Sequence, residues 1–284
     1  MIWYTICGGL LFTNLILLFI YIGGYDGLLF TWIPIQSALV TVTFTGTALS
    51  LDQLLQVLFF NFASHLIPVC FLVVFSIGLQ FSPPYWKTMW GAAIISLVLP
   101  MVGLYLLSRS AILLFIAGII TIIINVVNVA HMNVNAPETV NITWKYVGVC
   151  NILTTICIIG LSLLVEYGHT AIATILTNIP VVSIVVLAQS TLVDRDRLLT
   201  QRHIALLALQ IWPSIAFTIS TILCLKMEWE QTLLIPTVFS LIIVLFQFVV
   251  FRYQKRKRKQ EKKTKIKETV FKYNLLHRGQ NIKF

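Results

Sequence analysis

The stretch Ser110–Ala130, SAILLFIAGIITIIINVVNVA, contains no charged side chain. An α-helix of this length rises about 30 Å, which is the thickness of the hydrocarbon core of a bilayer. Only Ser108 and Arg109 separate it from the apolar run before it. The stretch therefore predicts a membrane-spanning helix that turns back tightly on its predecessor.

Eight further charge-free stretches of similar length lie on either side. The predicted spans are 3–23, 28–49, 56–80, 88–107, 110–130, 146–165, 170–192, 203–224 and 231–251. A charge at bilayer depth costs roughly 3 kcal/mol or more, and continuous apolar runs favour helices over the alternating strands of a barrel. The sequence thus predicts an all-α polytopic membrane protein with about nine transmembrane helices. The first span lacks a basic start and a cleavage signal, so we expect it to be retained.

The composition excludes the common soluble classes. Of 284 residues, 58% are hydrophobic and 11% are charged, whereas soluble domains carry about 25% charged residues. Disorder is excluded as well, because it needs low hydrophobicity.

The net charge of +10 belongs to the C-terminal tail. Residues 1–251 hold 7 Lys and Arg against 8 Asp and Glu, and residues 252–284 hold 13 against 2. The loops on the tail side carry Lys87, Lys145, Arg195, Arg197 and Arg202, and the opposite loops carry Arg109 and Lys226. Because positive loops stay in the cytoplasm, we expect the N-terminus outside and the tail in the cytoplasm.

The two halves of the chain share ordered motifs. The pattern T-x-I-P-x-x-S occurs at 31–37 and at 177–183, and a proline in the third span, Pro68, matches Pro213 in the eighth. The similarity predicts a first four-span repeat at 1–109, a linking span and loop at 110–143, a second repeat at 144–252 and a tail at 253–284. The odd linking span makes the second repeat inverted, a 4+1+4 arrangement that recurs in secondary transporters. Two copies of a stable bundle without transport remain the alternative.

The second half resembles the GlpM-type family of small four-span bacterial membrane proteins. The likeness lies in the turn from Thr177 to Ser183 and in a following span that begins at His203 and contains Pro213-Ser214. The first half resembles the family more loosely. The resemblance implies a membrane fold and an envelope-related role, and it implies no reaction.

Two mid-span prolines mark a candidate substrate site. Each lacks a backbone donor and frees the carbonyl four residues earlier, which are those of Phe30 and Leu176. In a bilayer such carbonyls are met by neighbours or by a water-filled cavity. The candidate residues at these kinks are Pro34, Gln36, Ser37, Asn178, Pro180 and Ser183. An ordinary kink satisfied by its own helix is the alternative.

Asn61 and His65 complete the candidate site. They are four residues apart in the third span and share one helix face. His65 could relay protons, or it could be a neutral side chain hydrogen-bonded between helices. Both interpretations stay open from the sequence.

Enzymatic chemistry is not expected. The chain has five cysteines, all within predicted spans and none in a C-x-x-C pair, and it has no nucleotide-binding or hydrolase motif. We expect no metal, no cofactor and no catalytic residue.

The tail carries the run Lys255, Arg256, Lys257, Arg258 and Lys259 directly after the last span. Such residues gain about 1 kcal/mol each near an anionic leaflet. We expect them to bind lipid headgroups, and we expect no nucleic-acid partner because aromatic residues are not interleaved with the charges. The sequence therefore predicts a membrane transporter of a small solute or ion, with a non-catalytic envelope component or scaffold as the alternative.

Overall fold

A computed structural model describes residues 50–81, 85–130, 144–225 and 234–250. It also describes Leu11, Asn14, Leu15, Leu18, Arg252, Tyr253 and Gln260. Within these residues every regular element is a helix, and there is no strand. The elements are α3 (Leu51–Ser64), α4 (Leu66–Gly78), α5 (Trp86–Leu107), α6 (Ala111–Ala130), α7 (Trp144–Glu166), α8 (Thr170–Thr177), α9 (Val181–Ala188), the π-helix η3 (Gln189–Val193) and α10 (Arg197–Cys224).

These helices form six spans that are long and apolar enough to cross a membrane. They cover Leu51–Gly78, Trp86–Leu107, Ala111–Ala130, Trp144–Val165, Thr170–Val193 and Arg197–Cys224, and a shorter apolar helix covers Leu234–Val250. This architecture fits an all-α integral membrane protein. These seven helices correspond to the third to ninth predicted spans, and their ends differ from the predicted ends by at most six residues. The first two predicted spans fall outside the described residues, apart from four positions.

The chain divides into two compact units, Met1–Ile243 and Val244–Phe284. The described part of the second unit is the end of the last helix and three further residues. There the guanidinium of Arg252 lies 5.1 Å from the centroid of the Phe248 ring. All further geometry concerns the first unit.

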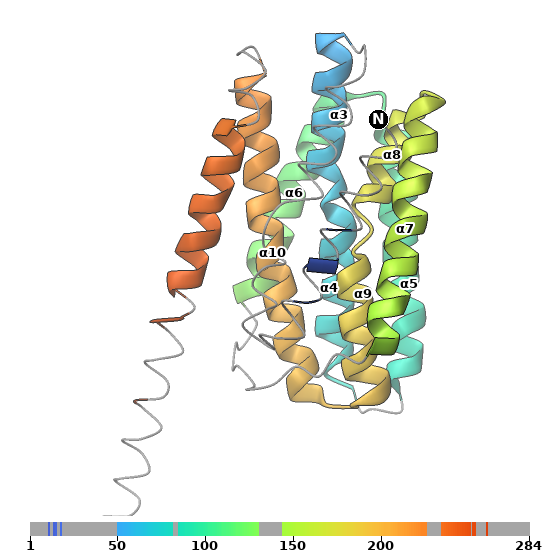
Figure 1. Cartoon of the computed structure of the whole chain (residues 1–284), viewed down its shortest axis with the longest axis vertical. Helices are drawn as coiled ribbons and strands as arrows, with labels where there is room; N and C mark the ends of the chain where they lie inside the picture. Colours follow the sequence, from blue (N-terminus) through green and yellow to red (C-terminus); the bar gives the residue numbers. More distant parts are fainter. Residues whose placement is uncertain are drawn as a thin grey trace, which may run out of the picture. The chain divides into compact units, whose positions relative to one another are not determined.

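The span formed by α3 and α4 is the centre of the first unit. In Figure 1 it runs between α10 and the helices α7, α8 and α9, and it contacts α6 and α5 as well. Its most apolar window is 67% buried, whereas that of α5 is 22% buried. The outer helices instead expose large side chains such as Ile112 on α6 and Ile156 on α7. An apolar surface of this kind is what a helix presents to lipid.

Two glycines allow the helices around this centre to approach closely. A Cβ built at Gly118 of α6 would collide with the Phe62 ring of α3, and one at Gly78 of α4 would collide with the Met89 side chain of α5. Small residues at helix crossings are typical of membrane bundles, where packing supplies much of the stability.

Polar caps decide where two of the spans begin. The Ser50 hydroxyl accepts from the Gln53 amide and the Gln53 side chain accepts from the Ser50 amide, which starts α3. A carboxylate oxygen of Asp196 accepts from the Leu199 amide at 3.0 Å, which starts α10. Each cap lets its helix include charged residues that the predicted span had left out. The helix α3 therefore begins five residues before the predicted span 56–80, and α10 begins six residues before the predicted span 203–224.

Candidate functional site

The fifth described span is broken at Pro180. Here the Val181 amide donates to the Ile179 carbonyl at 2.8 Å, and Pro180 has φ −80° and ψ 65°. These angles are those of an inverse γ-turn. The Leu176 carbonyl accepts from the Ile179 amide at 3.3 Å. The carbonyl freed by Pro180 is therefore satisfied by the local backbone.

A buried amide network lies beside this break. Asn178 Nδ2 donates to Asn61 Oδ1 at 2.9 Å and to the Thr174 carbonyl at 3.1 Å. Asn61 Nδ2 donates to Thr218 Oγ1 at 3.0 Å, and this hydroxyl donates in turn to the Ser214 carbonyl. Asn61, Thr174 and Thr218 are 0% exposed. One continuous set of hydrogen bonds thus joins α3, α8 and α10.

His65 belongs to the same cluster through the backbone. It lies at the turn between α3 and α4, and its Nδ1 is 2.7 Å from the Asn61 carbonyl oxygen. Because a carbonyl only accepts, Nδ1 carries the proton. Pro68, which lacks an amide donor, follows three residues later and explains the turn in this span.

A small cavity of about 40 Å³ opens where these groups meet. A volume near 15 Å³ on this measure is enough for one water, so there is room for roughly two. Its lining residues come from α4, the α8–α9 break and α10. They are His65, Pro68, Leu72, Asn178, Pro180, Val182, Ser183, Leu207, Gln210, Ile211 and Ser214.

The structure brings five of the predicted site residues together. His65, Asn178, Pro180 and Ser183 line the cavity, and Asn61 is hydrogen-bonded to Asn178. The other predicted positions, Pro34, Gln36, Ser37 and the basic run from Lys255 to Lys259, lie outside the described residues.

Sequence reasoning missed the contribution of α10. Gln210, Ser214 and Thr218 follow one another at intervals of four, so they share one helix face. Gln210 and Ser214 line the cavity, and Thr218 accepts from Asn61. The polar stripe was visible in a charge-free span, but short hydroxyl side chains often bond to their own helix and so give a weak signal.

A larger cavity of about 410 Å³ lies near the other end of α8. Residues from α3, the end of α5, the end of α7 and α8 line it. They are Gln53, Gln56, Val57, Phe60, Ser108, Arg109, Val165, Gly168, Thr170, Ala171 and Thr174. Its lining thus includes Thr174, whose carbonyl accepts from Asn178.

A third polar region lies at η3, the C-terminal end of the span Thr170–Val193. There Trp90 Nε1 donates to Thr191 Oγ1 at 3.0 Å, which links η3 to α5. His203 of α10 is 2% exposed, and within the described part of the chain neither ring nitrogen has a hydrogen-bond partner. In the loop beyond η3, burial raises the pKa of the Asp194 carboxyl, and neighbouring Asp196 acts in the same direction.

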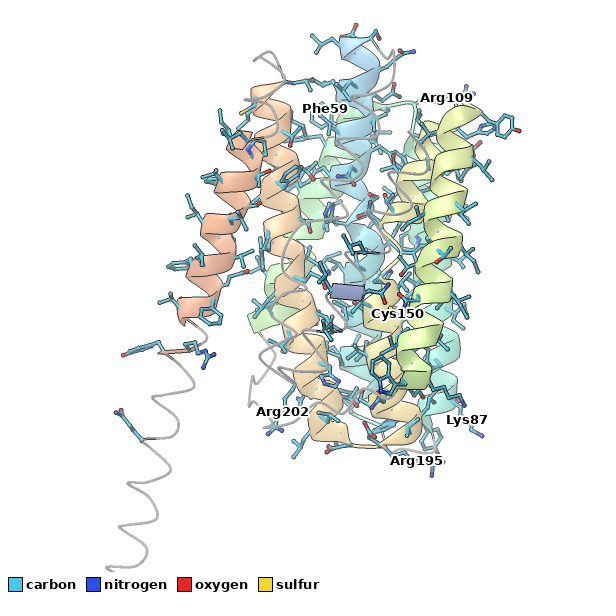
Figure 2. All side chains as sticks on the ribbon, viewed as in Figure 1. Phe59, Lys87, Arg109, Cys150, Arg195 and Arg202 are labelled. Carbon is cyan, nitrogen blue, oxygen red and sulfur yellow. The ribbon has the colours of Figure 1, made fainter. Side chains whose placement is uncertain are left out.

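Figure 2 shows that the labelled basic residues divide between the two ends of the bundle. Lys87, Arg195 and Arg202 lie at one end, and Arg109 lies at the other. Among the described residues no cluster of three or more His, Cys, Asp or Glu could hold a metal ion. In comparisons with known proteins, no family model, no curated protein and no solved structure matches the chain.

Proposed function

We propose that this integral membrane protein is a secondary transporter that moves a small solute or ion by alternating access. The observation that carries the proposal is the cavity at the α8–α9 break. A discontinuous helix beside polar side chains from other spans is the arrangement that transporters use to bind substrates near the middle of the membrane. Asn61, His65, Asn178, Pro180 and Ser183 form the described part of the site, and Pro34, Gln36 and Ser37 are its proposed counterpart in the first half.

The proposed architecture has nine spans in an inverted 4+1+4 repeat. Two contacts support it. Asn61 of the third span donates to Thr218 of the eighth, and Asn151 of the sixth span donates to Asn14 of the first at 2.8 Å. Each contact joins two spans that the repeat pairs as counterparts. Figure 1 shows that the span of α3 and α4 runs opposite to α10, as an inverted pair does.

The proposed membrane context follows the charges. Lys87, Arg195 and Arg202 share one end of the bundle, which supports a cytoplasmic location for that end. We place the tail there as well, with Lys255–Lys259 on anionic lipid headgroups, in a bacterial inner membrane. The proposal includes no catalytic step, no cofactor and no nucleic-acid partner.

A second function is favoured by one observation. The side chains of the amide network use one another as hydrogen-bond partners. Asn178 donates to Asn61, and Asn61 donates to Thr218. Hydrogen bonds between side chains of different helices can hold a membrane bundle together without a bound solute. A non-catalytic envelope component, as the GlpM-type resemblance implies, would use the network as structural support only.

Accessibility of Ser183 separates the two functions without knowledge of the substrate. The experiment places Ser183→Cys in a background whose five native cysteines are replaced, and applies a membrane-impermeant maleimide to right-side-out and inside-out vesicles. A maleimide reacts with the thiolate, which forms only in contact with water. Alternating access predicts reaction from both sides. Reaction from neither side, or from one side only, would contradict transport and favour the structural role.

Two variants serve as controls. Ile156→Cys stands at a position of α7 that is 61% exposed on the apolar surface, so it should react from neither side. Pro180→Ala, combined with Ser183→Cys, restores an amide that can bond to the Leu176 carbonyl and so continue the helix through the break. The labelling rate of Ser183→Cys should then fall to that of Ile156→Cys.

A further inference from the structure

The larger cavity, near Arg109, is separate from the cavity at the helix break and has the size of a ligand site. Its volume is about 410 Å³, and small-molecule sites in proteins measure roughly 300–1,000 Å³. It lies between four helical spans. A solute in it would therefore be enclosed by protein on several sides.

The charge of the lining favours anions. Arg109 is the one charged residue among the described residues that line the cavity, and no carboxylate is among them. Nor does Arg109 form an ion pair or a hydrogen bond with another described residue. A guanidinium offers up to five N–H donors in a planar fork that matches a carboxylate. In a partly enclosed site its attraction for an anion is stronger than in bulk water.

The neutral lining residues favour an organic anion over an inorganic one. Gln53 uses its side-chain oxygen to accept from the Ser50 amide, which leaves Nε2 as a donor. Gln56 Nε2 donates one hydrogen to the Ser108 carbonyl at 2.6 Å and retains a second. Val57, Phe60, Val165 and Ala171 supply an apolar wall. Donors near Arg109 suit a carboxylate, and the wall suits a hydrocarbon body.

We infer that this cavity binds a small organic anion, a carboxylate with an apolar body, through Arg109. The binding itself does not require transport. Thr174, which lines this cavity, also contacts the helix break, because its carbonyl accepts from Asn178. That the anion then passes to the break, and so is the transported solute, rests on the proposed function.

Equilibrium binding tests the inference on the full chain in phosphatidylcholine nanodiscs. The probe is tritiated benzoate, measured by scintillation proximity, and the competitors are unlabelled benzoate, hexanoate, phosphate, benzamide and benzylamine. Benzoate and hexanoate should displace the probe. Phosphate should not, because it has no apolar body, and the neutral and cationic analogues should not, because they lack the negative charge.

Three variants locate the site. Arg109→Gln should weaken benzoate binding roughly tenfold or more, because it removes the charge-assisted hydrogen bonds to the carboxylate. Lys87→Gln removes a positive charge from the opposite end of the same helix and should leave binding unchanged. Ala171→Leu, which keeps Arg109 but fills the apolar side, should weaken benzoate as well.

Several results would overturn the inference. They are the absence of saturable benzoate binding, equal displacement by benzamide, displacement by phosphate alone, and unchanged affinity in Arg109→Gln. Loss of benzoate binding in phosphatidylglycerol nanodiscs would assign the cavity to lipid headgroups instead. Benzoate binding with one-sided labelling of Ser183→Cys would keep the anion site and reject transport. Two-sided labelling without benzoate binding would reject the anion site alone.

Discussion

At the scale of single residues, Asn178 links the helix break to the rest of the bundle. Its Nδ2 group donates to a side chain on α3 and to a carbonyl on its own helix. Both hydrogens of the amide are therefore used by a side chain that is 4% exposed, and an unpaired buried amide is costly. The residue that ends α8 beside the break thus also links this span to α3.

The Asn61–Asn178 pair can be measured by a double-mutant cycle. We expect Asn61→Ala and Asn178→Ala each to lower the free energy of unfolding, and the double variant to lower it by less than the sum. A coupling energy of about 0.6–1.7 kcal/mol is expected, the range for hydrogen bonds between membrane helices. Denaturant unfolding in mixed micelles gives all four values. Additive effects within about 0.3 kcal/mol would mean that the hydrogen bond contributes nothing to stability.

Some of the residues at the site could be predicted and others could not. Asn61, His65 and Asn178 stand out because large polar groups are rare in charge-free spans. Their mutual contacts depend on which spans are neighbours, and the order of the spans along the chain does not give that. Ser214 and Thr218 were missed because a hydroxyl that bonds to its own helix looks the same in the sequence as one that faces a cavity.

At the scale of elements, the positions of the third to ninth predicted spans followed from the charges. Which prolines break a helix did not follow from them. Pro100 and Pro213 lie inside the continuous helices α5 and α10, whereas Pro180 coincides with a break. The difference depends on tertiary neighbours. Asn178 is held by Asn61 beside the break, and the sequence singled out both residues without showing that they are in contact. The turn at His65 and the π-helix η3 were missed for the same reason.

Gly118 provides a test of how α3 and α6 pack. Gly118→Ala should lower the free energy of unfolding by about 1–3 kcal/mol, because the new methyl group collides with the Phe62 ring. The matched control is Gly103→Ala on α5, where an added Cβ meets nothing within 4 Å. Since alanine favours helix over glycine by up to about 1 kcal/mol, this control should be neutral or stabilising. Unfolding in detergent compares the two, and equal effects would argue against close packing at Gly118.

At the scale of the whole molecule, the charges sort to the ends of the bundle. Lys87 begins α5 and Arg109 follows its end, and Figure 2 shows them at opposite ends. Loop charges that the sequence assigned to one side, such as Lys87 and Arg195, lie together in space. Each span that the structure describes crosses the unit once, so the charges at its two ends are held apart. The assignment of each end to a compartment is a separate matter, which rests on the positive-inside tendency.

Single cysteines at these ends test that orientation. In a cysteine-free background, Arg109→Cys should react with an impermeant maleimide in intact cells, whereas Lys87→Cys and Arg195→Cys should react only after the membrane is permeabilised. All three positions lie at the ends of spans, so each thiol should reach water. The opposite pattern would reverse the orientation. Labelling of all three in intact cells would contradict the assignment of Lys87 and Arg195 to the cytoplasmic side.

The π-helix at Gln189–Val193 bears on how the sequence of this span can evolve. A π-turn holds one residue more than an α-turn, and each residue of an α-helix advances the face by about 100°. The side chains within η3 are therefore rotated relative to those of an uninterrupted α-helix. Thr191 in η3 meets Trp90, whereas Ser183, before η3, lines the cavity. A one-residue insertion is enough to create such a rotation, and a one-residue deletion would reverse it. The two ends of this span could thus acquire different neighbours through a single genetic event, without any substitution at the break.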